Sequence, residues 1–286
     1  MLSDADPSPR GPGPADEIAV RVRRRGISPK NYKLTIAYDG TGFHGWQRQP
    51  SGRTIQGELE NALECLAGGR IAVHGAGRTD AGVHARAQVA SFRAALTLDD
   101  ATLLRALNAL LPEAIRVSSV ERAGPRFHAR KSAHSKIYQY RIVLGRQVSP
   151  FDFRFVHHHP RPLNVARMRR AARLFVRKAD FSAFSSNREL NPVRRVTKSE
   201  FRERGAELIF TIEADGFLRY MVRTIVGTLI EVGRGRIAVE DVERLFGEKQ
   251  RTLASPTAPA KGLCLVRIDY APKDRARAKA SSRGLV

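Results

Sequence analysis

The order of apolar periodicities along residues 32–120 limits the folds open to this chain more than any other feature of its sequence. Alternating or continuous apolar residues predict strands at 32–38, 71–73, 88–92 and 115–120. Helical spacing predicts a helix at 55–66, capped by Thr54, and a second at 99–111, stopped by Pro112. The order strand–helix–strand–strand–helix–strand is that of a ferredoxin-like unit, the architecture of RNA-recognition modules.

The second half of the chain repeats this mixture of elements. Strands are predicted at 136–144, 193–202, 208–214 and 263–270, and helices at 164–176, 217–232 and 239–246. We therefore expect an α+β protein of two similar ferredoxin-like subdomains, 29–134 and 135–271, that share a largely antiparallel sheet. The helices should pack on one side of the sheet, and an active-site cleft should lie between the subdomains.

Charge points to a polyanionic partner. The 286 residues contain 50 Lys and Arg against 28 Asp and Glu, a net charge of +22, and an imbalance of this size favours nucleic acid. A membrane is disfavoured, because the chain contains no apolar run of about 18 residues. We expect a cytoplasmic protein, since no secretory signal begins the sequence. Residues 1–28 and 272–286 are predicted to be disordered basic extensions.

Cysteine and histidine usage does not support a metal centre or a disulfide framework. Cys65 and Cys264 both sit among apolar residues and are predicted to be buried thiols. The run 157–159 is three histidines, but successive side chains of a strand point to opposite faces. We expect no metal there, because a site needs convergent ligands.

The loop 75–85, GAGRTDAGVHA, is the strongest candidate for a functional site. It should connect two strands, where binding and catalytic groups tend to lie. Arg78 is two residues from Asp80 and should lower the pKa of that carboxyl group. An ionised aspartate suits a nucleophile or an electrostatic anchor. Taken alone, however, D-A-G is more often a structural turn, and the loop lacks the third glycine of a dinucleotide fingerprint and the lysine of a P-loop.

Positive charge is also placed on two predicted helices. The helix at 217–232 is apolar nearly all round and should be buried, so its Arg223 needs an anionic partner. The helix at 164–176 carries a set of arginines away from its apolar side, which we interpret as phosphate contacts rather than a solvated face: Arg167, Arg169, Arg170, Arg173 and Arg177. Trp46, the sole tryptophan, is equally compatible with base stacking and with packing.

Five motifs together resemble the tRNA pseudouridine synthase A family. The resemblance covers about residues 32–270. The motifs are YDGTGFHGWQRQ at 38–49, GAGRTDAGVHA at 75–85, KIYQYR at 136–141, MVR at 221–223 and APAKGLCL at 258–265. The last motif departs from the family at Cys264, where an aromatic residue is frequent, which puts one packing contact in doubt.

The resemblance implies roles for individual residues. Asp80 would be the catalytic nucleophile and Arg223 its partner, while Tyr138 would stack on the flipped base. Arg78 would help to extract and hold the nucleotide, and we include His84 among the substrate-binding residues.

The resemblance also implies an activity and partners. The enzyme would convert uridines at positions 38, 39 and 40 of the tRNA anticodon arm to pseudouridine, as a homodimer and without a cofactor or metal. A non-catalytic RNA-binding module would explain the charge and the fold, but not a buried Asp80 opposite Arg223. A nucleotide-dependent enzyme is disfavoured because the loop 75–85 matches neither the dinucleotide fingerprint nor the P-loop motif.

Overall fold

A mostly antiparallel sheet of ten strands runs through the computed structural model, which describes residues 28–187, 190–248 and 256–271. The strands are β1 (Lys30–Tyr38), β2 (His74–Gly75), β3 (His84–Ala94), β4 (Ile115–Arg122), β5 (Ala133–Leu144), β6 (His157–His159), β7 (Lys178–Asp180), β8 (Val193–Arg204), β9 (Glu207–Ala214) and β10 (Leu263–Tyr270). Their order is β4-β1-β3-β10-β5-β9-β8-β7, with β2 paired to β3 and β6 paired to β5. The predicted α+β class is confirmed.

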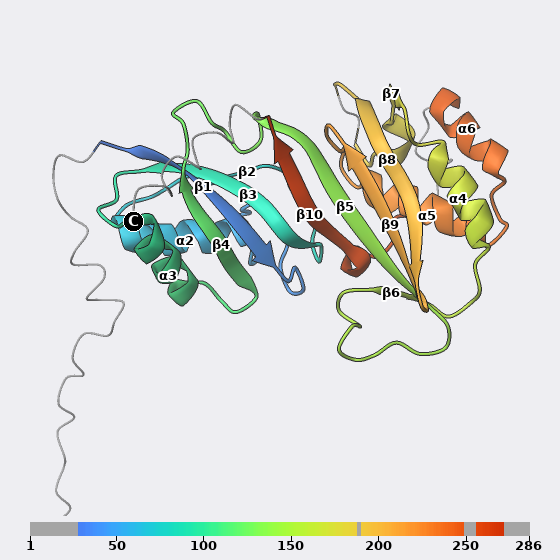
Figure 1. The fold of residues 1–286 in the computed structure, drawn as a ribbon, viewed down its shortest axis with the longest axis horizontal. Helices are drawn as coiled ribbons and strands as arrows, with labels where there is room; N and C mark the ends of the chain where they lie inside the picture. Colours follow the sequence, from blue (N-terminus) through green and yellow to red (C-terminus); the bar gives the residue numbers. More distant parts are fainter. Residues whose placement is uncertain (1–27, 188–189, 249–255, 272–286) are drawn as a thin grey trace, which may run out of the picture.

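Helices gather at the two ends of this sheet. Figure 1 shows α2 and α3 at the end that carries β4 and β1, and α4, α5 and α6 at the end that carries β9 and β8. The helices are α2 (Ile55–Ala67), α3 (Asp100–Leu110), α4 (Val165–Arg173), α5 (Met221–Gly233) and α6 (Val239–Glu248), with 3₁₀ turns at Ser182–Phe184 and Ala260–Gly262. No helix in the described part of the chain is long and apolar enough to cross a bilayer.

The C-terminal strand β10 joins the two ends of the sheet. It pairs in parallel with β3, where Cys264 lies opposite His84, and antiparallel with β5, where Leu265 lies opposite Tyr138. In Figure 1 this strand, drawn in dark red, lies between the strands of the first and second halves of the chain. Strand β10 therefore connects the strands of the first half to those of the second half.

Local signals account for most of the elements. The Thr54 hydroxyl accepts a hydrogen bond from the Gly57 amide and caps α2, and Asp99 caps α3 through the Thr102 amide. Such side-chain oxygens satisfy amides that have no partner inside the helix. Along β1, Tyr32, Leu34, Ile36 and Tyr38 are all buried, as the alternation predicts.

Several predicted boundaries differ from the structure, and two of these differences have a clear local reason. The short strand is His74–Gly75 rather than 71–73, because side chains of α2 take both backbone hydrogen bonds of Val73. The Val73 amide donates to Glu60, and the Val73 carbonyl accepts from Gln56. The helix predicted at 217–232 begins only at Met221. Tyr220 has φ of 61°, a left-handed conformation that cannot continue an α-helix.

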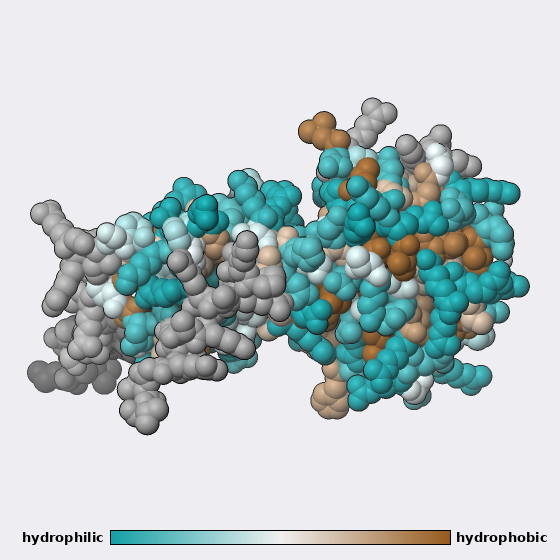
Figure 2. Space-filling view, turned by 45° about the horizontal axis from the view of Figure 1, so that its top comes forward, coloured by the Kyte–Doolittle hydropathy of each residue, from teal (hydrophilic) through white to brown (hydrophobic). Residues whose placement is uncertain are grey.

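The prediction that both cysteines are buried is wrong for Cys65. Cys65 is exposed, because the buried stripe of α2 runs through Leu59, Leu63 and Leu66 and leaves Cys65 outside it. Cys264 on β10 is half-buried, and burial raises the pKa of its thiol to about 11. Figure 2 shows a face covered largely by hydrophilic residues, with hydrophobic patches toward the end that carries α4 and α6. Apart from Ser28, the predicted extensions 1–28 and 272–286 lie outside the described residues.

Candidate active site around Asp80

Asp80 lies in the connection between β2 and β3, at the start of a tight turn. The Val83 amide donates to the Asp80 carbonyl over 3.1 Å, and Gly82 has φ of 75°. Because a side chain disfavours this conformation, glycine is required at the third position of the turn. The D-A-G sequence therefore forms a turn, as the structural interpretation predicts, and that turn presents the carboxylate.

A buried hydrogen-bond network holds the loop from below. The Tyr38 hydroxyl lies 2.8 Å from Thr79 Oγ1, and the fully buried Gln88 donates to the Gly77 carbonyl over 2.9 Å. Burial raises the pKa of Tyr38, so its phenol stays neutral and can donate. A satisfied buried network of this kind makes a loop rigid.

Trp46 is a packing residue of the same loop. It is 2% exposed, and its amide donates to the Thr79 carbonyl over 3.0 Å. A Cβ atom on Gly75 would lie 2.4 Å from its ring, so the ring requires glycine there. Because the Gly75 backbone lies directly against this ring, the structure favours packing over base stacking for Trp46.

Arg223 of α5 forms an ion pair with Asp80, 143 residues away in the sequence. Its Nη1 lies 3.1 Å from Asp80 Oδ2, and the two side chains are 15% and 23% exposed. Its Nε donates to the Ala258 carbonyl over 2.8 Å, and the Ala258 amide donates back to the Arg223 carbonyl over 3.0 Å. The first contact orients the guanidinium and the second fixes the Arg223 backbone, so the carboxylate that the guanidinium binds also has a defined orientation.

The protonation of Asp80 is set by two opposing effects. Burial raises the pKa of Asp80 above its ordinary value, and Arg223 and then Arg219 counteract that rise. The prediction that Arg78 lowers this pKa is wrong, because Arg78 is exposed and Arg223 takes the place beside the carboxylate. A partly desolvated carboxylate held by one guanidinium is well suited to nucleophilic attack.

Tyr138 on β5 lies beside Asp80. Its side chain is 6% exposed, and its ring meets that of Phe217 edge to face, with the centroids 5.1 Å apart. Burial raises the pKa of its phenol, and the charges of Tyr38 and Asp80 raise it further. The structure thus brings together Asp80, Arg223 and Tyr138 from three separate segments.

His84 is turned away from this group. The Gly40 amide donates to its Nδ1 over 3.0 Å, its Nε2 lies 3.0 Å from the Arg154 carbonyl, and its ring packs on Phe155. Burial lowers the pKa of His84, while nearby Asp39 counteracts this effect. Both ring nitrogens are occupied by protein groups, which supports a role for His84 in positioning loops.

Lys136 is a residue near the site that the sequence did not single out. A Cβ atom on Gly77 would lie 3.6 Å from Lys136 Nζ, which places the amine against the Asp80 loop. Burial, together with the charges of Arg130 and Arg194, lowers the pKa of Lys136 to about 8. The available signal was its place as the first residue of KIYQYR.

The other candidate groups lie elsewhere. Three arginines of the predicted set form ion pairs with glutamates: Arg169 of α4 with Glu203, Arg170 of α4 with Glu240, and Arg177, which lies beyond the end of α4, with Glu243. Their proposed phosphate contacts would have to compete with these carboxylates. Burial and the neighbouring histidines lower the pKa of His157 to about 4. Among the described residues, no group of three His, Cys, Asp or Glu could hold a metal ion.

The structure places a partly buried carboxylate, an arginine and a tyrosine close together, from the segments where three of the motifs lie. The family model described as tRNA pseudouridine synthase matches residues 34–130 and 171–271. The chain belongs to this family and is an isomerase of that class.

Individual relatives agree with this assignment. A tRNA pseudouridine synthase A of Methylacidiphilum infernorum is 45% identical over 84% of this chain and 96% of its own length. The protein of the same name from Thermodesulfovibrio yellowstonii is 41% identical over 84% and 99%. Among solved structures, a chain of a Cbf5-Nop10-Gar1 complex aligns with 82% of this chain and 48% of its own, at 9% identity and a TM-score of 0.32, too distant to assign a fold.

Proposed function

We propose that this enzyme converts uridines at positions 38, 39 and 40 of the tRNA anticodon arm to pseudouridine, with Asp80 as the nucleophile. The observation that carries the proposal is the ion pair of Asp80 with Arg223, next to the buried ring of Tyr138. RNA binding alone gains nothing from an enclosed carboxylate, because burying a charge is costly unless it is paired. A nucleophile, by contrast, needs a fixed geometry and a low exposure to water.

The reaction breaks the C1′–N1 glycosidic bond, turns the uracil within the site and rejoins it through C5. Because it is an isomerisation, it consumes no electron, group donor or external water. Asp80 would attack the substrate and form a transient covalent bond, Arg223 would hold the carboxylate, and Tyr138 would stack on the flipped uracil. Flipping costs a few kcal/mol, which stacking and phosphate contacts offset. Arg78, exposed on the catalytic loop, would hold the extracted nucleotide.

The finer architecture belongs to the same proposal. The pairings β4-β1-β3 and β2-β3 fit a ferredoxin-like first subdomain, and the hairpin β8–β9 next to β5 fits a second one. The cleft would lie where β10 joins them, above Asp80. A homodimer and a cytoplasmic location remain predictions from the family resemblance.

The test is to incubate unmodified tRNA transcripts with the purified enzyme and to map pseudouridine chemically. We expect modification of uridines 38–40 and no other uridine, and its loss with Asp80→Asn. Removing a nucleophile typically lowers turnover by at least roughly 10³-fold. Asp241→Asn, which changes an exposed aspartate of α6, is the matched control and should stay active. Modification at other positions, or an active Asp80→Asn enzyme, would contradict the site or the nucleophile, respectively.

A further inference from the structure

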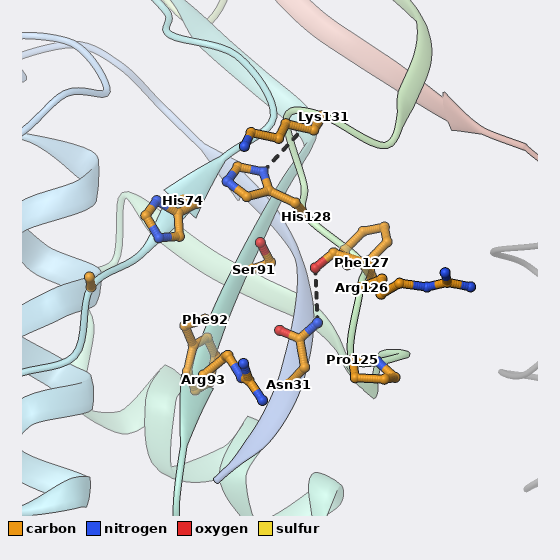
Figure 3. Close-up of a pocket in the computed structure, with 11 residues that line it drawn as sticks. Asn31, His74, Ser91, Phe92, Arg93, Pro125, Arg126, Phe127, His128 and Lys131 are labelled. Atoms are coloured by element: carbon orange, nitrogen blue, oxygen red, sulfur yellow. Dashed lines mark hydrogen bonds between the residues drawn. The ribbon is translucent and has the colours of Figure 1, made fainter.

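A pocket with a basic lining lies on the first half of the molecule, and neither Asp80, Tyr138 nor Arg223 lines it. Its volume is about 430 Å³, and its walls come from β1, β2, β3 and the connection between β4 and β5. Figure 3 shows the His74 and His128 rings beside Lys131 at one end and Arg93 and Arg126 at the other. No carboxylate is among its lining residues.

Hydrogen bonds hold the walls of this pocket in place. Asn31 Nδ2 donates to the carbonyls of Gly124 and Phe127 over 2.8 and 2.9 Å, and the Ser91 hydroxyl accepts from the Ala129 amide over 3.0 Å. The Arg130 amide donates to His128 Nδ1 over 3.1 Å. In a neutral ring this contact leaves Nε2 as the donor for a ligand.

The cations of the pocket lack the partners that nearby cations have. On the same sheet, Lys33 pairs with Glu121 and Arg122 with Asp100. Within the described residues, no carboxylate forms an ion pair with Arg93, Arg126 or Lys131. Burial and the charges of His74, Lys131 and Arg130 lower the pKa of His128, as expected where positive groups gather without a counter-charge. This lining favours an anionic ligand over a neutral or cationic one.

Positive charge continues from the pocket to the catalytic loop. Arg130 lies close enough to both His128 and Lys136 to lower the pKa of each, and Lys136 contacts Gly77 of the Asp80 loop. His74 and Asp80 are six residues apart, a span of at most about 20 Å for an extended chain. One nucleic-acid strand can therefore reach both places.

We propose that a basic track binds the sugar–phosphate backbone of the substrate tRNA and leads the target uridine to Asp80. The track consists of the pocket residues Arg93, Arg126, Lys131, His74 and His128, followed by Arg130 and Lys136. This inference rests on the proposed function for its ligand. Contacts of Arg and Lys to phosphates fix register and orientation without reading sequence. The track therefore positions the RNA, and the Asp80 site performs the chemistry.

The experiment compares two triple variants that remove the same charge. Arg93→Ala/Arg126→Ala/Lys131→Ala removes the three arginine and lysine side chains that line the pocket. Arg105→Ala/Arg202→Ala/Arg204→Ala is the control: all three arginines are exposed and none lines the pocket, Arg105 lies on α3, and Arg202 and Arg204 lie on β8, distant from β1 and β3 in the sheet order. Dissociation constants for an unmodified tRNA transcript are measured over a range of salt concentrations, together with KM and kcat.

Each lost phosphate contact should make the slope of log K against log salt shallower by about 0.7–0.9. We therefore expect a reduction of about 2–3 for the pocket variant, a tRNA KM raised about tenfold or more, and a nearly unchanged kcat. A pocket variant with the same slope and KM as the control would overturn the track. Arg93→Lys/Arg126→Lys/Lys131→Arg should keep the wild-type slope, and an equal loss in this variant would also refute a role for charge.

The outcome can be separated from failure of the proposed function. The wild-type enzyme is first shown to form pseudouridine in the same transcript. If it does and the pocket variant binds like the control, the track alone is wrong. Thermal unfolding of the variants checks that their folds are intact, which the exposure of the three side chains leads us to expect.

Discussion

At the scale of single residues, the site depends on the balance between burial and one ion pair. Burial raises the pKa of Asp80, and Arg223 counteracts it from 3.1 Å. Arg223 is held in turn by the Ala258 carbonyl. The Asp80 carboxylate, the proposed nucleophile, therefore receives its counter-charge from a residue 143 positions away in the sequence.

The pH dependence of catalysis should report this balance. Since Asp80 must be ionised and its pKa is raised above 3.8, kcat/KM should fall on the acid side at a higher pH than for an ordinary aspartate. Arg223→Ala removes the group that lowers this pKa, so the acid limb should move further up in pH. The pH profile of kcat/KM, measured with limiting tRNA, gives the shift. Arg223→Lys keeps the charge and should move the limb less, whereas an unmoved limb in Arg223→Ala would mean that another group titrates.

Tyr138 should act through its ring rather than its hydroxyl. Stacking on a base is typically worth about 1–3 kcal/mol, so Tyr138→Leu should lower kcat/KM by roughly tenfold or more. Tyr138→Phe keeps the ring and the edge-to-face contact with Phe217, and should remain close to wild type. Single-turnover assays distinguish the two variants. Equal inactivity of both would assign proton transfer to the phenol.

At the scale of elements, the contact of α5 with the segment before β10 holds Arg223 in place. A Cβ atom on Gly227 would lie 2.0 Å from the Pro256 carbonyl oxygen, so the two backbones approach as closely as glycine allows. One turn earlier on the helix, Arg223 exchanges hydrogen bonds with Ala258. Packing of two backbones thus positions a functional side chain.

Gly227→Ala should consequently impair catalysis although it changes no polar group. The methyl group must push the 256–258 backbone away, and a misplacement of about 1 Å at an active site can cost about 10²-fold in rate. We expect a lower kcat and a lower melting temperature, with tRNA affinity retained. Gly247→Ala is the control, because a Cβ atom there meets nothing within 4 Å. Wild-type kcat in Gly227→Ala would show that the contact does not set the position of Arg223.

At the scale of the whole molecule, β10 makes one structure of two halves. It pairs with β3 of the first half and β5 of the second, and the Asp80–Arg223 ion pair spans the same junction. Elements joined by a shared central strand cannot unfold separately without breaking both sets of hydrogen bonds. The described part of the chain should therefore unfold as one cooperative unit.

Unfolding in urea tests this cooperativity. Trp46, the only tryptophan, reports the first half by fluorescence, while circular dichroism reports all helices and strands. The two midpoints should coincide. Leu265→Ala in the fully buried centre of β10 should lower both together, by about 2–5 kcal/mol of unfolding free energy. Leu107→Ala, equally buried but confined to α3, should also shift both signals, and separate midpoints in any variant would reveal independent halves.

What could be predicted from the sequence is what local physics decides. Helix caps at Thr54 and Asp99 and the alternation along β1 depend on residues a few positions apart, so pattern alone determines them. The Asp80 motif identified the loop for the same reason, since its glycines and its carboxylate lie within one short stretch. A predicted strand failed only at 71–73, where Gln56 and Glu60 from the preceding helix take the backbone partners of Val73.

Tertiary structure alone decided which distant groups meet. Arg78 is the nearest arginine to Asp80 in sequence, yet Arg223 is its partner, because β10 and α5 bring the second half of the chain over the loop. Trp46 is enclosed, Cys65 is exposed and His84 is turned away from the site through contacts that no local pattern contains. The basic track likewise depends on β1, β2 and β3 lying side by side. Short-range preferences select the elements, whereas long-range packing selects the neighbours of each side chain, and catalysis depends on those neighbours.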